Sequence, residues 1–165
     1  LERASMVARV AVIGRVTPLR EVVDPLVRAL GKINQDKGLE ITVYCPDDAL
    51  FQGEKHDLEE MLGNLLDNAC KWASTRVSLE AKLVKSERHT GRRRLNIVIE
   101  DDGPGLSDEQ RARIGKRGLR LDETKPGSGL GLSIVIDLAQ SYRGTLALDA
   151  AKLGGLRAQL VLPAA

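Results

Sequence analysis

Residues 95–105 read LNIVIEDDGPG, an alternating apolar segment that ends in acidic residues and glycines. Its apolar side chains recur at every second position, which is the period of a half-buried strand. Residues 76–83 alternate in the same way, and a turn-rich stretch at 86–93 separates the two segments. The pattern therefore predicts a β-hairpin whose second strand ends in a polar, glycine-containing loop.

Helices and further strands are expected on both sides of this hairpin. Apolar residues recur every three or four positions over 19–37, with Gly38 as the terminator, and again over 55–73. The other expected elements are strands at 39–45, 50–52, 145–150 and 157–162 and a helix at 132–142. This order predicts an α+β fold: a two-layer α/β sandwich whose mixed, mostly antiparallel sheet is backed by about three helices.

Composition limits the class of protein. The chain has 165 residues, 42% of them hydrophobic but only 2% aromatic, which predicts one domain with an aliphatic core. The net charge of +2, without a basic stripe interleaved with aromatics, argues against nucleic acid as a partner. No apolar run approaches the roughly 20 residues of a membrane span. Cys45 and Cys70 lie in apolar segments without metal-ligand spacing, and we expect buried free thiols.

The helix predicted at 55–73 has a polar face beside its apolar one. The residues on one stripe about 80° wide are Asp57, Glu60, Asn64, Asn68 and Lys71. Amide oxygens are suited to sharing a Mg²⁺ that already carries phosphate oxygens, and an ammonium group adds positive charge toward phosphates. A solvated helix face would show the same pattern, so this segment alone leaves both interpretations open.

The end of the second hairpin strand also carries chemistry. Asp101 ends the apolar strand, and Gly103 and Gly105 follow. A carboxylate there can accept a hydrogen bond from an exocyclic amino group, which adenine has and guanine lacks at that ring position. Glycines let the backbone approach a flat ring or adopt positive φ. An ordinary acidic turn has the same composition, so two interpretations again remain.

Residues 125–133 read KPGSGLGLS and open the last predicted helix. Alternating glycines before a helix expose backbone N–H groups and the positive helix end, an arrangement that binds anions. The segment is not a Rossmann fingerprint, because no strand immediately precedes it. It is not a P-loop either, because no Gly-Lys-Ser/Thr follows. Taken alone, such a segment is more often a flexible turn.

Together the three segments resemble the N, G1 and G2 boxes of the GHKL ATPase superfamily, in the same order and on the same elements. This superfamily includes gyrase, Hsp90, MutL and the histidine kinases. The resemblance extends from about Leu19 to the C-terminus, and residues 63–72 and 100–105 are most similar to PhoQ-type sensor histidine kinases. It implies a Bergerat fold, in which ATP lies between helices under a mobile lid.

The resemblance implies a role for each matching position. Asn68 would bind Mg²⁺, while Asn64 and Lys71 would act at the phosphates as catalytic residues. Trp72 would lie beside the nucleotide, and Asp101 would bind the adenine amino group. The other residues implied to bind ATP are Gly103 and Gly105 in the pocket, Arg117, Arg120 and Lys125 in a lid over residues 106–128, and Gly127, Ser128, Gly129, Leu130, Gly131 and Leu132 in the glycine-rich segment.

Asn64 separates branches of the superfamily. Gyrase, Hsp90 and MutL have a glutamate four residues before the metal-binding asparagine, and that glutamate activates water. An amide cannot act as a general base, which favours phosphotransfer over ATP hydrolysis. The implied reaction is transfer of the γ-phosphoryl group to a histidine on a dimerisation hairpin, followed by transfer to a response-regulator aspartate.

The phosphoacceptor is expected outside this chain. His56 and His89 lack the family's His-Glu context and are expected at the surface. Residues 1–14, before a break at Pro18, would be the end of the dimerisation-hairpin helix, and 15–165 the catalytic domain. The implied partners are the chain's own dimerisation domain and a response regulator. The fragment would be monomeric, its parent a homodimer, and its location the cytoplasmic side of a bacterial inner-membrane protein.

Two other functions stay open. One is another enzyme of the superfamily, such as a serine-directed anti-sigma kinase or a low-rate ATPase. The other is a degenerate nucleotide-binding module that acts only through partner contacts, although the intact asparagines, Asp101 and glycines argue against it. One position departs from the family pattern: the lid often carries a phenylalanine near the position of Gly115, so lid anchoring is expected to differ here.

Overall fold

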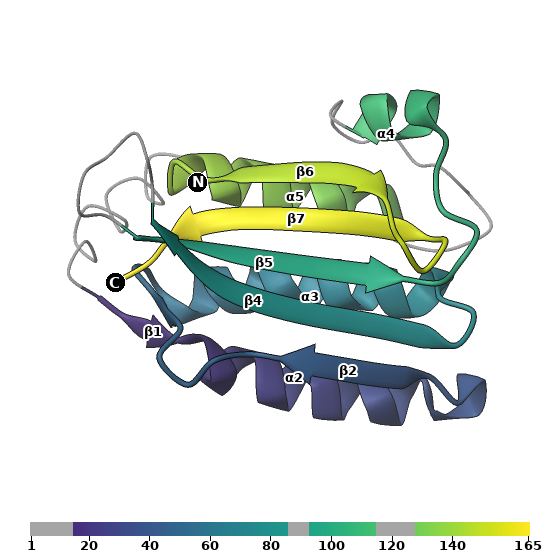
Figure 1. The fold of residues 1–165 in the computed structure, drawn as a ribbon, viewed down its shortest axis with the longest axis horizontal. Coiled ribbons are helices and arrows are strands. Elements are labelled where there is room, and N and C mark those ends of the chain that lie inside the picture. Colours follow the sequence, from purple (N-terminus) through teal and green to yellow (C-terminus); the bar gives the residue numbers. More distant parts are fainter. Residues whose placement is uncertain (1–14, 86–92, 115–127) are drawn as a thin grey trace.

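A computed structural model describes residues 15–85, 93–114 and 128–165, and its fold is a sheet layer with a helix layer on one face (Figure 1). The five-stranded sheet has the order β2-β4-β5-β7-β6. Its strands are β2 (Glu40–Tyr44), β4 (Arg76–Lys85), β5 (Arg93–Asp101), β6 (Thr145–Ala150) and β7 (Leu156–Pro163). β2 is parallel to β4, and the other neighbouring pairs are antiparallel. The predicted mixed, mostly antiparallel sheet is confirmed.

Three helices back this sheet, as predicted: α2 (Leu19–Ile33), α3 (Lys55–Trp72) and α5 (Ser128–Ser141) (Figure 1). The short helix α4 (Asp108–Ile114) lies apart, beyond β6. A 3₁₀ turn (Gln35–Lys37) follows α2, and Gly38 ends it in the left-handed conformation with φ 62°. Over the described residues, every helix is too short or too polar to cross a membrane.

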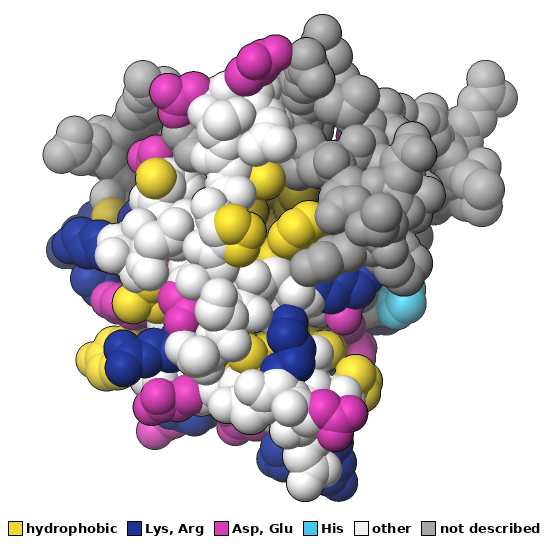
Figure 2. Space-filling model, turned by 90° about the vertical axis from the view of Figure 1, so that its right-hand side faces the viewer, with side chains coloured by type: hydrophobic (Ala, Val, Ile, Leu, Met, Phe, Trp, Pro, Cys, Tyr) yellow, Lys and Arg dark blue, Asp and Glu magenta, His cyan; other side chains and the backbone are white. Residues whose placement is uncertain are grey.

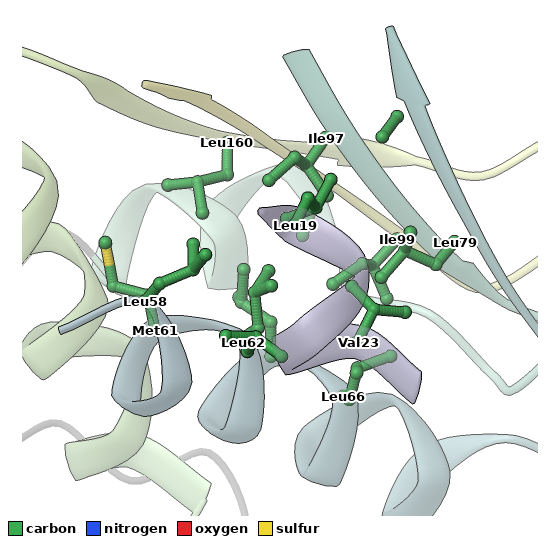
Figure 3. Close-up of a cluster of buried hydrophobic side chains, with 14 of the residues drawn as sticks. Leu19, Val23, Leu58, Met61, Leu62, Leu66, Leu79, Ile97, Ile99 and Leu160 are labelled. Atoms are coloured by element: carbon green, nitrogen blue, oxygen red, sulfur yellow. The ribbon is translucent and has the colours of Figure 1, made fainter. Parts of the chain in front are cut away.

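The core lies between the two layers and is aliphatic, as the composition predicts (Figure 3). Alternation along the strands turns every second side chain toward the helices, so that Leu79 faces Ile99 and Ile97 faces Leu160 across neighbouring strands. The helices contribute Leu19 and Val23 from α2 and Leu58, Met61, Leu62 and Leu66 from α3. The core therefore holds α3 against the sheet, so that its C-terminal residues Asn68 and Trp72 lie near the end of β5.

Three boundaries differ from the sequence prediction. Helix α2 ends at Ile33, four residues before the predicted end at Lys37. Residues Thr17–Pro18 form a short strand, β1, antiparallel to β3 (Leu50–Phe51), where only a break was expected. Two residues carry no periodicity, so the pairing depends on tertiary contacts such as the hydrogen bond from Thr17 Oγ1 to the Gly53 carbonyl (3.0 Å). Helix α5 begins at Ser128, four residues before the predicted start at Leu132. The low helix propensity of glycine favours a later start, but packing against α3 outweighs it.

Both cysteines are buried and free, as predicted. Burial raises the pKa of both thiols above its ordinary value, that of Cys70 to about 11. At neutral pH the thiols are therefore protonated, and they pack as small apolar side chains.

Candidate functional site

A pocket of about 360 Å³, including its open mouth, lies where β5 and α3 end. Its lining residues are Asn68, Trp72, Asp101, Gly105, Leu106, Leu132 and Leu156. Figure 2 looks onto this end of the sheet and shows hydrophobic side chains exposed beside the residues that are not described. The pocket thus brings together residues from all three segments that the sequence singled out, although these segments are up to 64 positions apart from Asn68 to Leu132.

Asp101 is the charged residue among those that line this pocket. Its side chain is buried, with only 1% of the residue exposed. Oδ1 accepts hydrogen bonds from the backbone N–H of Gly103 (2.9 Å) and of Leu156 (3.4 Å). Burial raises the pKa of the carboxyl above its ordinary value, although these hydrogen bonds oppose the rise.

The second oxygen of Asp101, Oδ2, accepts no hydrogen bond from any residue in the described ranges. A buried acceptor without a partner is costly, and such groups in folded proteins are usually satisfied. A ligand N–H group that entered the pocket would supply the missing hydrogen bond. The residue therefore fits the amino-group acceptor that the sequence predicts at this position.

Glycines allow the backbone to close tightly around Asp101. A Cβ atom on Gly103 would lie 2.1 Å from the Trp72 carbonyl oxygen, and one on Gly155 would lie 2.0 Å from Asp101 Oδ1. Gly155 N–H also donates to the Asp101 carbonyl (3.0 Å). Gly105 has φ 71°, so glycine is favoured there for its conformation as well. The roles of Gly103 and Gly105 in binding a nucleotide remain predictions.

The β6–β7 turn is the part of the site that the sequence analysis missed. Gly155 lies in this turn and Leu156 is the first residue of β7, and the backbone N–H groups of both donate to Asp101. The available signal was the Gly154-Gly155 pair, but a glycine pair between two strands is an ordinary hairpin signal and does not indicate a ligand. Only the antiparallel pairing of β5 with β7 reveals the connection.

The polar face of α3 continues from the pocket toward α5. Asn64 Nδ2 donates to the carbonyl of Glu60 (2.7 Å), one turn earlier. A Cβ on Gly131 would lie 3.1 Å from Asn64 Oδ1, so the backbone of α5 closely approaches this amide. Lys71 Nζ lies 3.3 Å from Asp67 Oδ2. The structure thus places Asn64 beside the glycine-rich segment and Lys71 in an ion pair on the same helix.

Much of the predicted lid lies outside the described residues, including Arg117, Arg120, Lys125 and Gly127. For Ser128, Gly129 and Leu130 the structure describes helical backbone only. The described part of the lid contains α4, whose start has a reciprocal capping box: Ser107 Oγ accepts from Gln110 N–H, and Gln110 Oε1 accepts from Ser107 N–H. His56 is exposed, as expected, while His89 lies outside the described residues.

A metal ion would find few protein ligands here. Within the described ranges, no three His, Cys, Asp or Glu side chains are grouped so that they could hold a metal. The pocket wall instead offers the neutral amide of Asn68. Such a site suits a Mg²⁺ that obtains most of its ligands from substrate phosphates and water.

Comparisons with known proteins agree with this geometry. Residues 53–165 match the family described as "Histidine kinase-, DNA gyrase B-, and HSP90-like ATPase". Sensor protein PhoQ of Escherichia coli strain K12 is 35% identical over 161 residues, which are 98% of this chain and 32% of PhoQ. The chain therefore spans about a third of the length of that relative.

Two solved structures share the fold at similar length. A mycobacterial sensor histidine kinase, MprB, superposes with a TM-score of 0.74 at 29% identity, over 91% of this chain and 97% of that one. The ATP binding domain of PrrB from Mycobacterium tuberculosis gives a TM-score of 0.70 at 25% identity, over 91% and 96% of the two chains. The pocket, the order of its three segments and these similarities lead to one conclusion: the chain belongs to the histidine kinase-, DNA gyrase B- and HSP90-like ATPase family, and its homologues are the ATP-binding domains of sensor histidine kinases.

Proposed function

We propose that this chain binds Mg-ATP and is the catalytic domain of a sensor histidine kinase. It would transfer the γ-phosphoryl group to a histidine on a dimerisation domain outside this chain. The observation that carries the proposal is the buried Asp101, which lines the pocket together with Asn68 and whose Oδ2 lacks a hydrogen-bond partner among the described residues. The similarity to PhoQ, MprB and PrrB supports the same assignment.

In this proposal the adenine ring occupies the pocket at the end of β5. Its exocyclic amino group donates to Asp101, and the apolar surfaces of Leu132 and Leu156 and the indole of Trp72 contact the ring. Guanine has a carbonyl oxygen at the equivalent ring position, so it would face the carboxylate with an acceptor. The pocket would therefore select ATP over GTP.

The phosphates would extend along the polar face of α3 toward the start of α5. Asn68 is the proposed Mg²⁺ ligand, and the bound ion would neutralise charge on the phosphate oxygens. Asn64 and Lys71 would contact the phosphates, and the N-terminal turn of α5 would present N–H groups to them. Lys71 would exchange its partner Asp67 for phosphate when nucleotide binds.

At the position of Asn64, gyrase, Hsp90 and MutL have a glutamate that activates water, so this chain has no general base at that position. The amide Nδ2 of Asn64 is already bound to the Glu60 carbonyl, and an amide cannot accept a proton. Catalysis would then depend on positioning and charge neutralisation, as in other phosphoryl transfers. The proposal includes a lid over 106–128, a dimerisation helix that ends in residues 1–14, a homodimeric membrane-anchored parent and a response regulator as the final acceptor.

Nucleotide binding is the first test. The domain should bind a non-hydrolysable ATP analogue in calorimetric titration, with higher affinity when Mg²⁺ is present, and should bind the matching GTP analogue much more weakly. Asn68→Ala should remove most of the Mg²⁺ effect but keep the preference for adenine, because Asn68 is proposed to act at the metal. Equal binding of both nucleotides would contradict the proposed base pocket.

The phosphorylated product is the second test. The domain would be incubated with ATP and the dimerisation domain of its own parent protein. Phosphohistidine is labile in acid and stable in base, and this is the expected product. An acid-stable phosphoserine would instead favour the anti-sigma type of kinase, and release of phosphate without a labelled protein would favour an ATPase.

A further inference from the structure

Lys37 connects two parts of the chain that the proposed mechanism does not join. Its Nζ donates to the carbonyl oxygens of Cys70 (2.8 Å) and Lys71 (2.9 Å), in the last turn of α3. These carbonyls have no partner within the helix, because the last turn lacks the following N–H groups. A cation at this position also complements the negative end of the helix dipole. Lys37 therefore caps the C-terminus of α3 from outside the helix.

Local structure holds Lys37 in place for this contact. It ends the 3₁₀ turn, and the hydrogen bonds from Lys37 N–H to Asn34 and from Gly38 N–H to Gln35 shape that turn. Three residues after Lys37, the backbone N–H of Glu40 donates to the Thr75 carbonyl (2.8 Å), just beyond the C-terminus of α3. The segment after α2 thus runs alongside the junction between α3 and β4.

The last turn of α3, which Lys37 caps, contains residues that line the pocket. Trp72 ends α3 and lines the pocket, and Asn68 lines it one turn earlier. The Trp72 carbonyl lies so close to Gly103 that a Cβ there would approach it to 2.1 Å. A shift of the last turn of α3 would therefore move the Trp72 wall and the loop after Asp101 together.

We infer that Lys37 is a positioning residue for the nucleotide base: it holds the last turn of α3 so that Trp72 and the loop at Gly103 form the pocket around Asp101. The inference rests on the proposed function, since it names a further residue of the same site. The charge of Lys37 also favours the ionised form of Asp101, although by less than the hydrogen bonds from Gly103 and Leu156 do. Lys37 would thereby support both the shape and the charge of the pocket.

The test compares Lys37→Met with Lys37→Arg and Lys32→Met. Methionine keeps an apolar stem but removes the cation, and arginine can still donate to the two carbonyls. Lys32 is exposed at the end of α2, and its side chain makes no hydrogen bond or ion pair with the described residues, so Lys32→Met controls for loss of one positive charge. Trp72 is the only tryptophan, which makes its emission a direct report on the wall of the pocket.

We expect Lys37→Met to shift Trp72 emission and to bind the ATP analogue about two- to fivefold more weakly than the wild-type domain. Lys37→Arg should restore most of both properties, and Lys32→Met should change neither. If Lys37→Met only lowers the melting temperature, with emission and affinity unchanged well below it, Lys37 is merely stabilising and the inference is wrong. A wild-type domain that binds no nucleotide would overturn the proposed function and this inference together.

Discussion

Asp101 and Asp102 are adjacent carboxylates at the end of the same strand, yet their surroundings are opposite. Asp101 is buried, and one of its oxygens has no partner among the described residues. Asp102 is half-buried and accepts hydrogen bonds from the backbone N–H groups of Ser74, Thr75 and Arg76 and from the Thr75 hydroxyl. Burial raises the pKa of Asp101, whereas these hydrogen bonds hold the pKa of Asp102 well below its usual range.

The contrast separates a functional carboxylate from a structural one. The carboxylate of Asp102 is fully used in joining β5 to the α3–β4 turn, so it has little capacity left for a ligand. Within the described part of the chain, Asp101 keeps one acceptor without a hydrogen bond, although burying a charged group costs free energy. Buried polar groups without a hydrogen-bond partner are concentrated at binding sites, because a bound ligand can supply the missing hydrogen bond.

The largest expected effect comes from closing the space beside Asp101. In Gly155→Ala the new methyl group would meet Asp101 Oδ1 at 2.0 Å, and the backbone on both sides would have to move. We expect the free energy of unfolding to fall by about 3 kcal/mol, with loss of nucleotide binding. Urea denaturation and calorimetric titration would measure the two effects.

Gly31→Ala is the matched control for that variant. A Cβ at Gly31 meets nothing within 4 Å, and the residue lies in α2. This change should stabilise the domain by up to about 1 kcal/mol, because alanine is the better helix former. If Gly155→Ala were as stable as Gly31→Ala and the wild-type domain, a Cβ at Gly155 would not clash with Asp101.

Asp101→Asn should distinguish Asp101 from Asp102, because it is expected to weaken nucleotide binding without lowering the stability of the fold. Asparagine keeps Oδ1 but replaces Oδ2 with an NH₂ donor, so an adenine amino group would meet another donor. Affinity for the ATP analogue should fall by about 100-fold, or about 2.7 kcal/mol. The melting temperature without nucleotide should stay the same or rise, since a buried charge is removed. Calorimetry and thermal unfolding check the two outcomes, and retained affinity would refute the assignment of Asp101.

Asp102→Ala should show the reverse behaviour. It removes the acceptor for four donors at the α3–β4 turn, and we expect the free energy of unfolding to fall by about 2 kcal/mol. Affinity for the ATP analogue should be largely retained, because Asp102 does not line the pocket. Urea denaturation would give the stability, and a variant as stable as wild type would show that these hydrogen bonds contribute little.

The smallest expected effect is in the pH dependence of stability. The pKa of Asp102 is lower in the folded state than its ordinary value near 3.8. Asp102 therefore stabilises the fold above about pH 3.8, and this stabilisation is progressively lost as the pH falls below that value. The effect of Asp101 on stability has the opposite pH dependence, because its pKa is raised in the folded state. Its stabilising contribution is present below about pH 3.8 and is lost as the pH rises through the folded-state pKa.

Asn variants at both positions would measure these two contributions. Urea denaturation from about pH 3 to 7 should show that the stability deficit of Asp102→Asn relative to wild type is constant near neutral pH and begins to shrink as the pH falls below about 3.8. Over the same range, Asp101→Asn should change from less stable than wild type in acid to equally or more stable at neutral pH. Parallel curves for the two variants would contradict the difference in environment.

Periodicity was sufficient for most of the fold. The predicted patterns match the strands at 76–85 and 93–101 and the helices at 19–33 and 55–72. Burial of one face requires an apolar residue at every second position of a strand, or every three to four positions of a helix, and this spacing is visible in the sequence. The pairing of β1 with β3 could not be predicted, since two residues have no period. The early start of α5 could not be predicted either, because close packing on Asn64 favours glycines within that helix.

The sequence by itself determined which chemical groups are available: the asparagines on α3, the carboxylate at the end of β5 and the glycines before α5. Each belongs to a local pattern that can be recognised without coordinates. Tertiary structure alone decided which of the two adjacent carboxylates is buried, with one oxygen that accepts no hydrogen bond from the described residues. It also decided that the turn at Gly155 packs against that carboxylate and that Lys37 caps the C-terminus of α3. These properties depend on partners tens of residues away, which only the packed sheet brings into contact.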